Sequence, residues 1–441
     1  MTLWSTLAKD VLRLVPGLHP AACLRLRGGH VILPSGVVQA DLVIQGERIT
    51  AVEYPRRGAA EERTVDVSGL LVFPGLINAH DHLEFNCFPR LGERGSYVNS
   101  YEWGLDITRR RRSAVVDRVL EIPLRERLLA GGYKNLFAGV TTVCHHGTYW
   151  RLFERGFPVA VVKRYGWCHS LGFGGDVAGS YRRTPPDAPW IIHLAEGTDE
   201  RARGELAQLA ALGCLAANTV VVHGVGLSQA DLRLMAQQGA GLIWCPASNL
   251  FMLGHTAPIR DTVGSRPPSQ ESPPACTARV ALGSDSRLTG SRDLLAELNV
   301  ARSLGVASDE QLFRMVTQDA ARLLRIDGQV GTIETAKRAD LLVLAGDPAS
   351  PYQALATAHA ERADIRLVLV GGRPAYGAPE FSELFQAWRG PYTPAYVGGQ
   401  PRLVAGRSAQ VQRYLEIETR LVDLETGFFA PRESRVSGAT L

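Results

Sequence analysis

Four apolar runs of this chain each end in residues of the types that bind metal ions. In chain order these residues are the pair His80 and His82, then His193, His223 and Asp285. Imidazole and carboxylate groups together suit Zn²⁺, Fe²⁺ or Mn²⁺ better than Ca²⁺ or Mg²⁺. An ion of this kind lowers the pKa of a bound water, so that hydroxide is available near neutral pH. The residue types therefore indicate a site for a divalent transition-metal ion.

The spacing of these residues fits side chains that gather at one rim of a barrel. His80 and His82 are two positions apart on a predicted strand, so their side chains point to the same side. His193 and His223 are separated by about one β/α repeat, and Asp285 follows after about two more. The carboxyl ends of barrel strands meet at one rim, where active sites lie. A single histidine that ends a strand is commonly structural, but four strands that end alike favour a metal site.

Apolar strands and amphipathic helices alternate from about residue 69 to residue 326. The expected strands are LLVFPGLINA, VTTVC, VAVVK, WIIHLA, TVVVH, GLIWC and RVALG. This alternation predicts parallel strands with crossover helices, and about eight units of this length would close a TIM-like (β/α)8 barrel. Between Lys163 and Trp190 the sequence is rich in Gly and Pro and leaves little room for a regular unit. We therefore expect an α/β barrel that is irregular around its fourth unit.

Short β-rich runs bracket the barrel segment at both ends of the chain, with turn signals between them. They predict one small β-sandwich domain that is built from both chain ends. We expect residues 1–68 and 327–400 to form this domain, residues 69–326 to form the barrel, and residues 401–441 to be a C-terminal extension. A Pro/Ser-rich insert at 265–278 is expected to be an exposed loop.

Composition narrows the class of protein. Hydrophobic residues make up 45% of the 441 residues and charged residues 21%, as is usual for a soluble globular protein. The formal charge of +4 is too weak to indicate nucleic-acid binding, and no apolar run is long enough to cross a bilayer. The seven cysteines are scattered and odd in number, which fits free thiols in a reducing compartment. We expect a cytoplasmic protein that acts on a small molecule, without nucleic-acid or membrane partners, and leave a homodimer open.

Five short motifs occur in a fixed order between residues 73 and 287: PGLINAHDHL, IIHLAEGTDE, VVHGVGL, CPASN and LGSDS. In this set the chain resembles the amidohydrolase superfamily, and within it the mononuclear branch of cytosine deaminases, guanine deaminases and triazine hydrolase-like enzymes. The resemblance implies that one ion is bound by His80, His82, His193 and Asp285. Zinc is the first expectation for this ion, with iron or manganese as alternatives.

The resemblance also implies catalytic roles for three residues. Glu196 would carry protons to the substrate, His223 would hydrogen-bond the water or the attacked group, and Asp285 would take the first proton. The expected activity is hydrolysis of a non-peptide carbon–nitrogen bond, by deamination of a nitrogen heterocycle through attack of metal-bound hydroxide. Ring-opening hydrolysis of a cyclic amide, or displacement of another leaving group, is the alternative. A non-catalytic scaffold homologue is a further one.

Other polar or aromatic side chains follow strands that would open on the same rim. The candidate substrate contacts among them are His145, His146, Arg164, Trp167, His169 and Glu84. Packing or loop support is the alternative for each. A carboxylated Lys163 that bridges two ions is disfavoured, because Arg164 stands beside it and Glu196 fits the mononuclear pattern. Asn249, in CPASN, is expected to support loop architecture.

Overall fold

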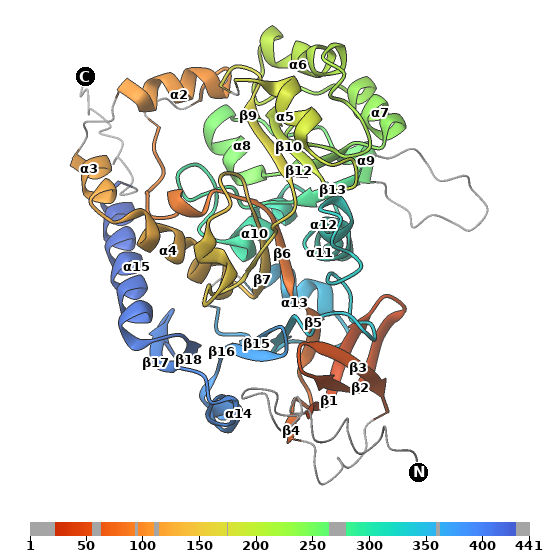
Figure 1. Ribbon diagram of the computed structural model, residues 1–441, viewed down its shortest axis with the longest axis vertical. Coiled ribbons are helices and arrows are strands. Elements are labelled where there is room, and N and C mark those ends of the chain that lie inside the picture. The colour runs from red at the N-terminus through yellow and green to blue at the C-terminus, as the bar shows by residue number, and fades with distance from the viewer. Residues whose placement is uncertain are drawn as a thin grey trace, which may run out of the picture.

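The computed structural model describes residues 23–54, 63–92, 96–109, 114–173, 175–263, 279–358 and 362–428, with backbone alone for residue 114 and residues 422–428. The insert predicted at 265–278 lies outside the described residues. In Figure 1 the parallel strands and their helices form the upper part of the molecule, and strands from both chain ends lie together below them.

Eight parallel strands in two sheets form the centre of the molecule. The smaller sheet holds β6 (Leu76–Asp81), β7 (Val140–His145) and β8 (Ala160–Val161). The larger sheet holds β9 (Gly166–Ser170), β10 (Trp190–Leu194), β11 (Thr219–His223), β12 (Gly241–Trp244) and β13 (Arg279–Leu282). All neighbours within both sheets are parallel. The predicted α/β architecture with parallel strands is confirmed.

The irregularity predicted around the fourth unit takes the form of short elements. The fourth strand is β9, and a helix of seven residues, α5 (Val177–Arg183), follows it. The register between β9 and β10 shifts between Ile192 and His193, and β8 has only two residues. The sequence did not reveal β9 because GWCHS alternates between buried and exposed positions and lacks a continuous apolar run.

Helices flank the parallel strands. They include α4 (Leu124–Leu136), α6 (Glu200–Ala211), α7 (Gln229–Gln238), α8 (Pro246–Leu253), α10 (Leu294–Ser303), α11 (Asp309–Met315) and α12 (Gln318–Leu323). Helix α6 begins at Asp199, whose side chain accepts a hydrogen bond from the amide of Ala202. Helix α7 begins with a capping box at Ser228 and ends at Gly239. The φ of Gly239 is 72°, a left-handed conformation that glycine adopts without steric strain.

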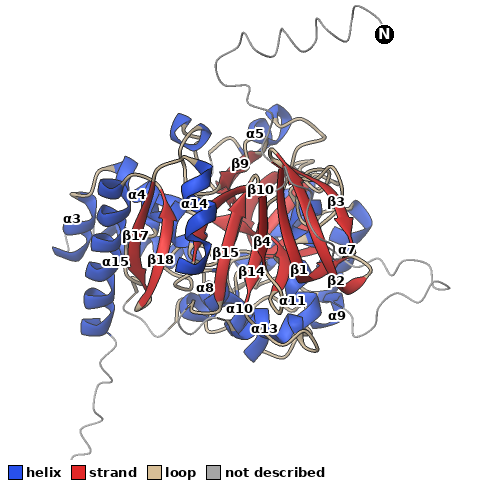
Figure 2. Cartoon of the chain, turned by 90° about the horizontal axis from the view of Figure 1, so that it is seen from below, coloured by secondary structure: helices blue, strands red, loops and turns tan. Residues whose placement is uncertain are grey.

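Strands from both chain ends form one sheet of ten strands. Its order is β17 (Tyr392–Val397), β18 (Gln400–Ala405), β16 (Arg373–Gly377), β15 (Ile365–Val370), β14 (Leu341–Leu344), β5 (Leu71–Pro74), β1 (Cys23–Leu33), β2 (Gly36–Gln45) and β3 (Arg48–Glu53), with β4 (Arg63–Asp66) beside β1. The antiparallel pairing of β5 with β14 joins the N-terminal and C-terminal parts. Figure 2 shows these strands from below. Both chain ends therefore build one β structure, as the sequence predicts.

Three further helices belong to the C-terminal part: α13 (Pro351–Thr357), α14 (Ser382–Trp388) and α15 (Ser408–Phe428). Helix α15 runs beside α4 (Figure 1), and the guanidinium Nε of Arg413 donates to Glu126 Oε2 at 2.8 Å between them. Within the part of the chain that the structure describes, no helix is long and apolar enough to cross a membrane.

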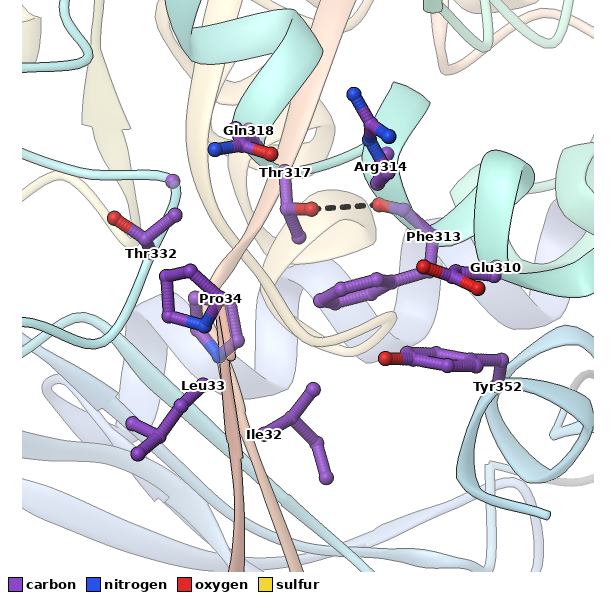
Figure 3. A pocket seen from close by; sticks show the side chains of 12 residues that line it. Ile32, Leu33, Pro34, Glu310, Phe313, Arg314, Thr317, Gln318, Thr332 and Tyr352 are labelled. Carbon is purple, nitrogen blue, oxygen red and sulfur yellow. Dashed lines mark hydrogen bonds between the residues drawn. The ribbon is translucent and has the colours of Figure 1, made fainter. Parts of the chain in front are cut away.

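A small cavity of about 100 Å³ lies near the amino end of β6 (Figure 3). Ile32, Pro74, Phe313 and Tyr352 line it, and Thr317 closes one side with a 2.6 Å hydrogen bond to the carbonyl of Phe313. Pro74 stands before β6, at the opposite end of that strand from His80. The cavity is therefore separate from the rim that carries the histidines.

Candidate active site

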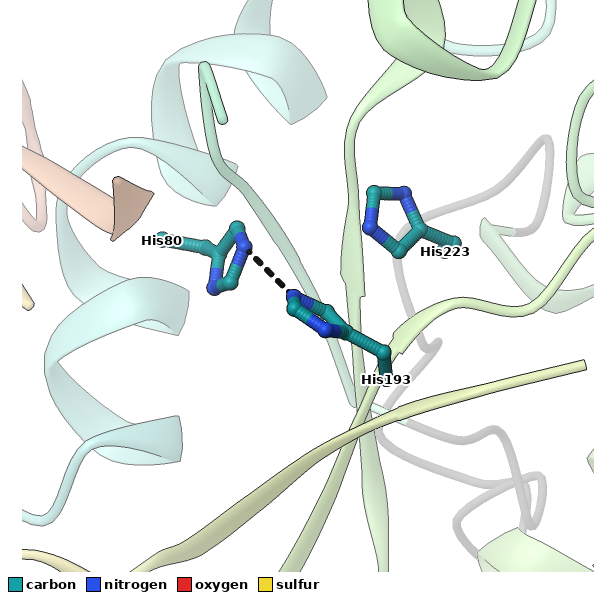
Figure 4. Close-up of side chains that lie close together, drawn as sticks. All are labelled: His80, His193 and His223. Atoms are coloured by element: carbon teal, nitrogen blue, oxygen red, sulfur yellow. Dashed lines mark hydrogen bonds between the residues drawn. The ribbon is translucent and has the colours of Figure 1, made fainter. Parts of the chain in front are cut away.

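The strand ends that the sequence singles out meet at one buried point. His80 lies on β6 with His82 just beyond it, His193 lies on β10, and His223 ends β11. The ring centroid of His80 is 4.9 Å from that of His82 and 5.0 Å from that of His193, which is 5.1 Å from that of His223. Figure 4 shows His80, His193 and His223 with their rings turned toward one another.

Donor atoms in this cluster lie as close together as the ligands of one ion. His80, His193 and His223 form one group of three atoms within 4.8 Å of one another, and His80, His82 and Asp285 form a second. His80 belongs to both groups. Its Nε2 is 3.2 Å from His193 Nε2 and 3.6 Å from Asp285 Oδ1. When one of these two Nε2 atoms carries a proton they share a hydrogen bond (Figure 4), and when neither does, both lone pairs are free to face a cation between them.

The ionisation of the cluster also suits a metal. Burial lowers the pKa of His80 to about 4 and holds the pKa of His193 well below the usual range. Both imidazoles are therefore neutral at pH 7, which is the form that binds metal ions. Among the described residues, the Nδ1 atoms of His80 and His193 are buried and have no hydrogen-bond partner. Buried polar atoms normally have partners, so this neighbourhood is not a finished structural core.

Asp285 is held so that one of its oxygens stays available. Its Oδ2 accepts hydrogen bonds of 2.8 Å from the hydroxyls of Ser248 and Thr289. Its Oδ1 faces His80 and lies 3.5 Å from His82 Nε2. Burial favours the protonated acid, but the hydrogen bond with His80 and the nearby His82 hold the pKa of Asp285 well below its usual range. The carboxylate is ionised and aimed into the cluster.

Backbone strain gathers at the same strand ends. Ala195, His223 and Asp285 have φ angles of 53°, 74° and 51°, in the left-handed region that residues other than glycine seldom adopt. Each such residue costs on the order of 1 kcal/mol, and such strain clusters at functional sites. The three residues follow three different strands, so the strain belongs to the rim as a whole.

Glu196 and His223 form an acid–base pair beside the cluster. Glu196 is buried, and its Oε1 is 3.4 Å from His223 Nε2. Burial raises the pKa of Glu196 to about 7, against the opposing effect of His223. On the other edge of the ring, His223 Nδ1 is 2.9 Å from Asn249 Oδ1. The amide oxygen can only accept, so Nδ1 carries a proton and Nε2 is turned to Glu196.

Asn249 therefore orients the ring of His223, a role that was not predicted from the sequence. It also hydrogen-bonds the carbonyl of His223 at 3.5 Å and Thr256 at 3.4 Å, as a loop-supporting residue would. The signal in the sequence was the CPASN motif directly after the strand GLIWC, which sets Asn249 beside the end of the neighbouring strand.

Three of the candidate substrate contacts line the cluster. The ring of His146 is stacked on that of His193, with 4.4 Å between the ring centroids and 9° between the ring planes. Neither ring nitrogen of His146 has a hydrogen-bond partner among the described residues. The ring centroid of Trp167 is 5.3 Å from that of His146, and Trp167 is 38% exposed, so its side chain extends from the site to solvent. His169 lies 4.8 Å from His193, and burial lowers its pKa to about 4.

The other three candidates lie apart from these rings. His145 and Glu84 face each other, with Nδ1 and Oε2 3.7 Å apart, and the amide of Leu83 donates to the same Nδ1 at 3.4 Å. Arg164 makes an exposed two-bond pair with Asp187, at 2.6 and 2.5 Å. The geometry gives no support to the prediction of a substrate contact for Arg164, because the chain turns outward after the very short β8.

Lys163 is likewise turned to solvent. It is 68% exposed and pairs with Glu154 at 2.7 Å. This position agrees with the expectation that it does not bridge two ions.

A polar network beneath the histidines was missed from the sequence. Lys134, on the buried face of α4, forms an ion pair with Asp81 at 3.1 Å and donates to Asn86 at 2.7 Å and to Ser284 at 3.1 Å. Asp81 stands between His80 and His82, and Ser284 precedes Asp285. The available signal was a lysine within the apolar stretch of a helix, which requires a buried acceptor.

Comparison with known proteins fits this geometry. Residues 154–375, about half of the chain, match the model of the amidohydrolase family. The chain belongs to the amidohydrolase family. The resemblance carried by the five motifs is thereby confirmed, and with it the class of hydrolases that act on carbon–nitrogen bonds other than peptide bonds.

Relatives of this amidohydrolase are named as deaminases. A 5-methylthioadenosine/S-adenosylhomocysteine deaminase of Syntrophobacter fumaroxidans is 26% identical over 360 residues, which cover 68% of this chain and 78% of the relative. The protein of the same name from Pyrococcus horikoshii is 25% identical over 374 residues, which cover 72% and 85%.

Solved structures of similar fold contain zinc. An adenosine deaminase of Xanthomonas campestris with bound zinc has a TM-score of 0.64 at 18% identity, over 92% of this chain and 100% of that one. The atrazine chlorohydrolase of Arthrobacter aurescens complexed with zinc has a TM-score of 0.65 at 17% identity, over 90% and 100%. At these identities the likeness concerns the fold alone.

Proposed function

We propose that this amidohydrolase removes an amino group, as ammonia, from a nitrogen heterocycle in a metal-dependent reaction. The observation that carries the proposal is the pairing of Glu196 with His223 beside the buried donor cluster. A carboxyl group with a pKa of about 7 can both take up and release a proton at neutral pH. A cluster of histidines with a purely structural role would not need a neighbouring carboxyl group that exchanges protons at neutral pH.

One divalent ion would be held by His80, His82, His193 and Asp285. Zinc is the first choice, and iron or manganese are alternatives. The neutral imidazoles and the single free carboxylate oxygen are a donor set that zinc accepts. When bound, the ion would supply Lewis-acid activation of a water molecule. The zinc named in both solved relatives supports this choice.

The residues of the chain account for the proton transfers. Asp285 is ionised and can accept a proton from the attacking water. Glu196 can deliver a proton to a ring nitrogen or to the leaving amino group. His223, oriented by Asn249, can stabilise charge that develops on the attacked group. In the balanced reaction the carbon exchanges its amino nitrogen for the oxygen of water, and one proton of water leaves on ammonia.

The walls of the site favour a flat, aromatic substrate. Trp167 is partly exposed beside the site, and His146 offers two unpartnered ring nitrogens within the described surroundings. Phe173, 49% exposed, packs against Tyr101 at 5.1 Å and extends the apolar rim. Because relatives are named for 5-methylthioadenosine and S-adenosylhomocysteine, adenine nucleosides are the first substrates to test.

We also infer that the eight parallel strands close into one barrel and that the ten-stranded sheet folds over itself as a sandwich. The amide of Asp285 donates to the carbonyl of His80 at 3.0 Å, which links the last parallel strand to the first. Leu42 and Leu369, from opposite wings of the large sheet, share one buried cluster. The domain limits expected at 68, 326 and 400 remain part of this proposal, except that β5 and β18 pair with β14 and β16 and so extend the β-domain a few residues beyond 68 and 400.

Exchange of Glu196 for Gln tests the proposal directly. The variant should keep the ion and lose most turnover, by about 10²- to 10⁴-fold, because the proton carrier is gone while the ligands remain. Ammonia release is measured on 5′-methylthioadenosine, S-adenosylhomocysteine, adenosine, pyrimidines, pterins and triazines, with bound metal measured in parallel. The matched control is Glu200→Gln, since Glu200 is close in sequence but 88% exposed.

Each outcome of this experiment has a definite meaning. Equal turnover in Glu196→Gln would remove the proton-carrying role. A wild-type protein that opens cyclic amides without ammonia release would replace deamination by the ring-opening alternative. A purified protein without about one equivalent of transition metal, and without turnover, would favour a scaffold over an enzyme.

A further inference from the structure

The last helix of the structure carries a partly buried carboxylate toward the segment that bears Asp285. Glu418 lies on α15, and its side chain is 19% exposed. Its Oε1 accepts a 2.7 Å hydrogen bond from Arg287, and its Oε2 accepts one of 2.8 Å from the hydroxyl of Tyr414. Arg287 opposes the effect of burial and keeps the pKa of Glu418 at about 2. The carboxylate is therefore ionised, and both of its oxygens accept a hydrogen bond.

Arg287 ties this carboxylate to the turn after β13. It is the second residue after Asp285 and is only 3% exposed. Its Nε donates to the carbonyl of Arg292 at 3.1 Å, so the guanidinium spans the turn from within. Its backbone amide donates to Asn86 Oδ1 at 3.2 Å. One arginine thus connects α15, both sides of the turn, and the segment that follows His82.

From Asn86 the hydrogen bonds continue beneath the histidines. Its Nδ2 donates to Asp81 Oδ1 at 2.8 Å, and its Oδ1 also accepts from Lys134 at 2.7 Å. Lys134 in turn reaches Ser284, the residue before Asp285. An unbroken chain of hydrogen bonds therefore runs from α15 to the residues that flank His80, His82 and Asp285.

A second arm holds the far end of the same turn. Arg362 donates to Asp293 Oδ2 at 2.7 and 3.1 Å, and Asp293 caps α10 through the amide of Ala296. Arg362 is also 3.9 Å from Glu418. Arg292, which is 38% exposed, also donates to Asp293 Oδ2 at 3.1 Å. Each charge of Arg287, Arg362, Asp293 and Glu418 thus has a partner of opposite sign, which is the condition under which burying charges is tolerated.

The turn needs such support because Asp285 is strained. Its φ of 51° is unfavourable for a residue other than glycine, and such a conformation persists only when its surroundings impose it. Thr289, which holds Oδ2 of Asp285, lies within the same turn. Loosening the turn would therefore shift the carboxylate together with one of the two hydroxyls that aim it.

We propose that Glu418 is a positioning residue for Asp285, and that α15 completes the active site by holding the turn 284–293 through Arg287. The proposal rests on the proposed function in one respect, since that function assigns Asp285 its place at the ion. It makes the C-terminal helix part of the catalytic apparatus, without any contact between that helix and the substrate.

The test compares Glu418→Gln with Glu416→Gln, which changes an exposed glutamate on the same helix that pairs with Arg413. Amide hydrogen exchange is measured in the full-length protein for the turn 284–293 and for the strands β10 and β11. Bound metal, kcat and KM are measured on the same samples. Arg287→Met and the double variant Glu418→Gln/Arg287→Met complete a cycle that shows whether Glu418 acts through Arg287.

Glu418→Gln should speed exchange in the turn by at least about 10-fold and leave β10 and β11 unchanged. It should lower kcat by about 10- to 100-fold with KM nearly constant, as loss of an outer support for a ligand does. The double variant should lose no more activity than Arg287→Met alone. Glu416→Gln should match the wild type in every measurement.

Unchanged exchange in the turn would overturn the proposal, as would uniformly faster exchange in all strands, which would mark a general loss of stability. Should Glu418→Gln fail to fold, the double variant, with both charges removed, gives the same exchange comparison. A wild-type protein without metal or turnover would overturn the proposed function, while the exchange in the turn would still decide the role of Glu418.

Discussion

The molecule holds two buried clusters of titratable side chains, and they are built on opposite principles. In the histidine cluster, the Nδ1 atoms of His80 and His193 and both ring nitrogens of His146 have no hydrogen-bond partner among the described residues. In the cluster of Arg287, Arg362, Asp293 and Glu418, the charged groups are paired at 2.7 Å. Buried polar groups normally have hydrogen-bond partners. The unpartnered nitrogens of the first cluster therefore indicate a binding site, whereas the paired charges of the second cluster indicate a structural role.

This difference predicts which changes affect activity and which affect stability. The histidine cluster has three strained residues at its strand ends, against one, Arg362 with a φ of 56°, in the charged cluster. Such strain is typical of sites that give up stability for function. The charged cluster lies between α15, α10 and the turn after β13, where loss of one partner leaves a charge buried and unpaired.

The largest effect is expected for His193→Ala. The variant should lose the ion and at least about 10³-fold in kcat/KM, because a bound ion supplies several kcal/mol of transition-state stabilisation. The stability of the ion-free protein should change little, by about 1 kcal/mol, since His193 has an unpartnered buried nitrogen in the described structure. Metal analysis, turnover and urea unfolding with a chelator check this. A variant that keeps its ion would remove His193 from the ligand set.

Arg362→Met should show the reverse behaviour. Removal of the guanidinium takes away two of the hydrogen bonds of Asp293 and leaves it with the partly exposed Arg292, which donates to Oδ2 at 3.1 Å, and with the amide of Ala296. Loss of the buried partner should therefore cost on the order of 3 kcal/mol of unfolding free energy. The metal ligands are untouched, so the folded fraction should still bind the ion. Urea unfolding at pH 7 measures the loss. A change below about 1 kcal/mol would show that the charged cluster adds nothing to stability.

The two clusters also differ in how far the sequence could predict them. The histidines end apolar runs, and parallel strands bring such ends together, so His80, His193, His223 and Asp285 could be grouped from periodicity alone. Strand β9 escaped notice because its five residues alternate in burial, and the pairing that stabilises it comes from β10.

The support beneath the site could not be predicted in the same way. Glu418 and Arg287 are 131 residues apart, and glutamates on long helices are normally solvated. Lys134 meets Ser284 across 150 residues. Periodicity predicts which face of a helix is buried, but it does not indicate which charged side chain of another element will pair with a charge on that face. The prediction for Arg164 failed to find support for a different reason. Its place just after a strand suggested a side chain at the site, but position in the sequence does not determine the direction in which a side chain points.

A pH dependence of stability should follow from Glu297, a buried carboxylate on α10 that accepts from the amide of Ala247 at 2.8 Å. Burial raises its pKa to about 7, from 4.5. Between these pH values the folded state binds more protons than the unfolded state, so stability falls as pH rises from about 5 to 7. Glu297→Gln keeps the acceptor and cannot ionise. It should therefore gain on the order of 2 kcal/mol relative to wild type between pH 5.5 and pH 8.

Unfolding of both proteins in urea at the two pH values, with a chelator present, measures this gain. Glu196, whose pKa is also raised to about 7, contributes to the fall in the wild type and is retained in the variant. The variant should thus become less sensitive to pH without losing its dependence entirely. Parallel curves for the two proteins would mean that Glu297 does not carry the buried proton.

The smallest effect is expected for Arg164→Ala, which removes one partner of an exposed ion pair. Arg164 is 62% exposed and Asp187 is 68% exposed, so water screens the pair and replaces it when it is broken. The melting temperature should stay within about 2 °C of wild type, in contrast to Arg362→Met. KM should also stay the same, because the guanidinium is turned away from the histidine rings. A KM several-fold higher at unchanged kcat would restore Arg164 as a substrate contact, and would require its side chain to leave Asp187 and swing toward the site when substrate binds.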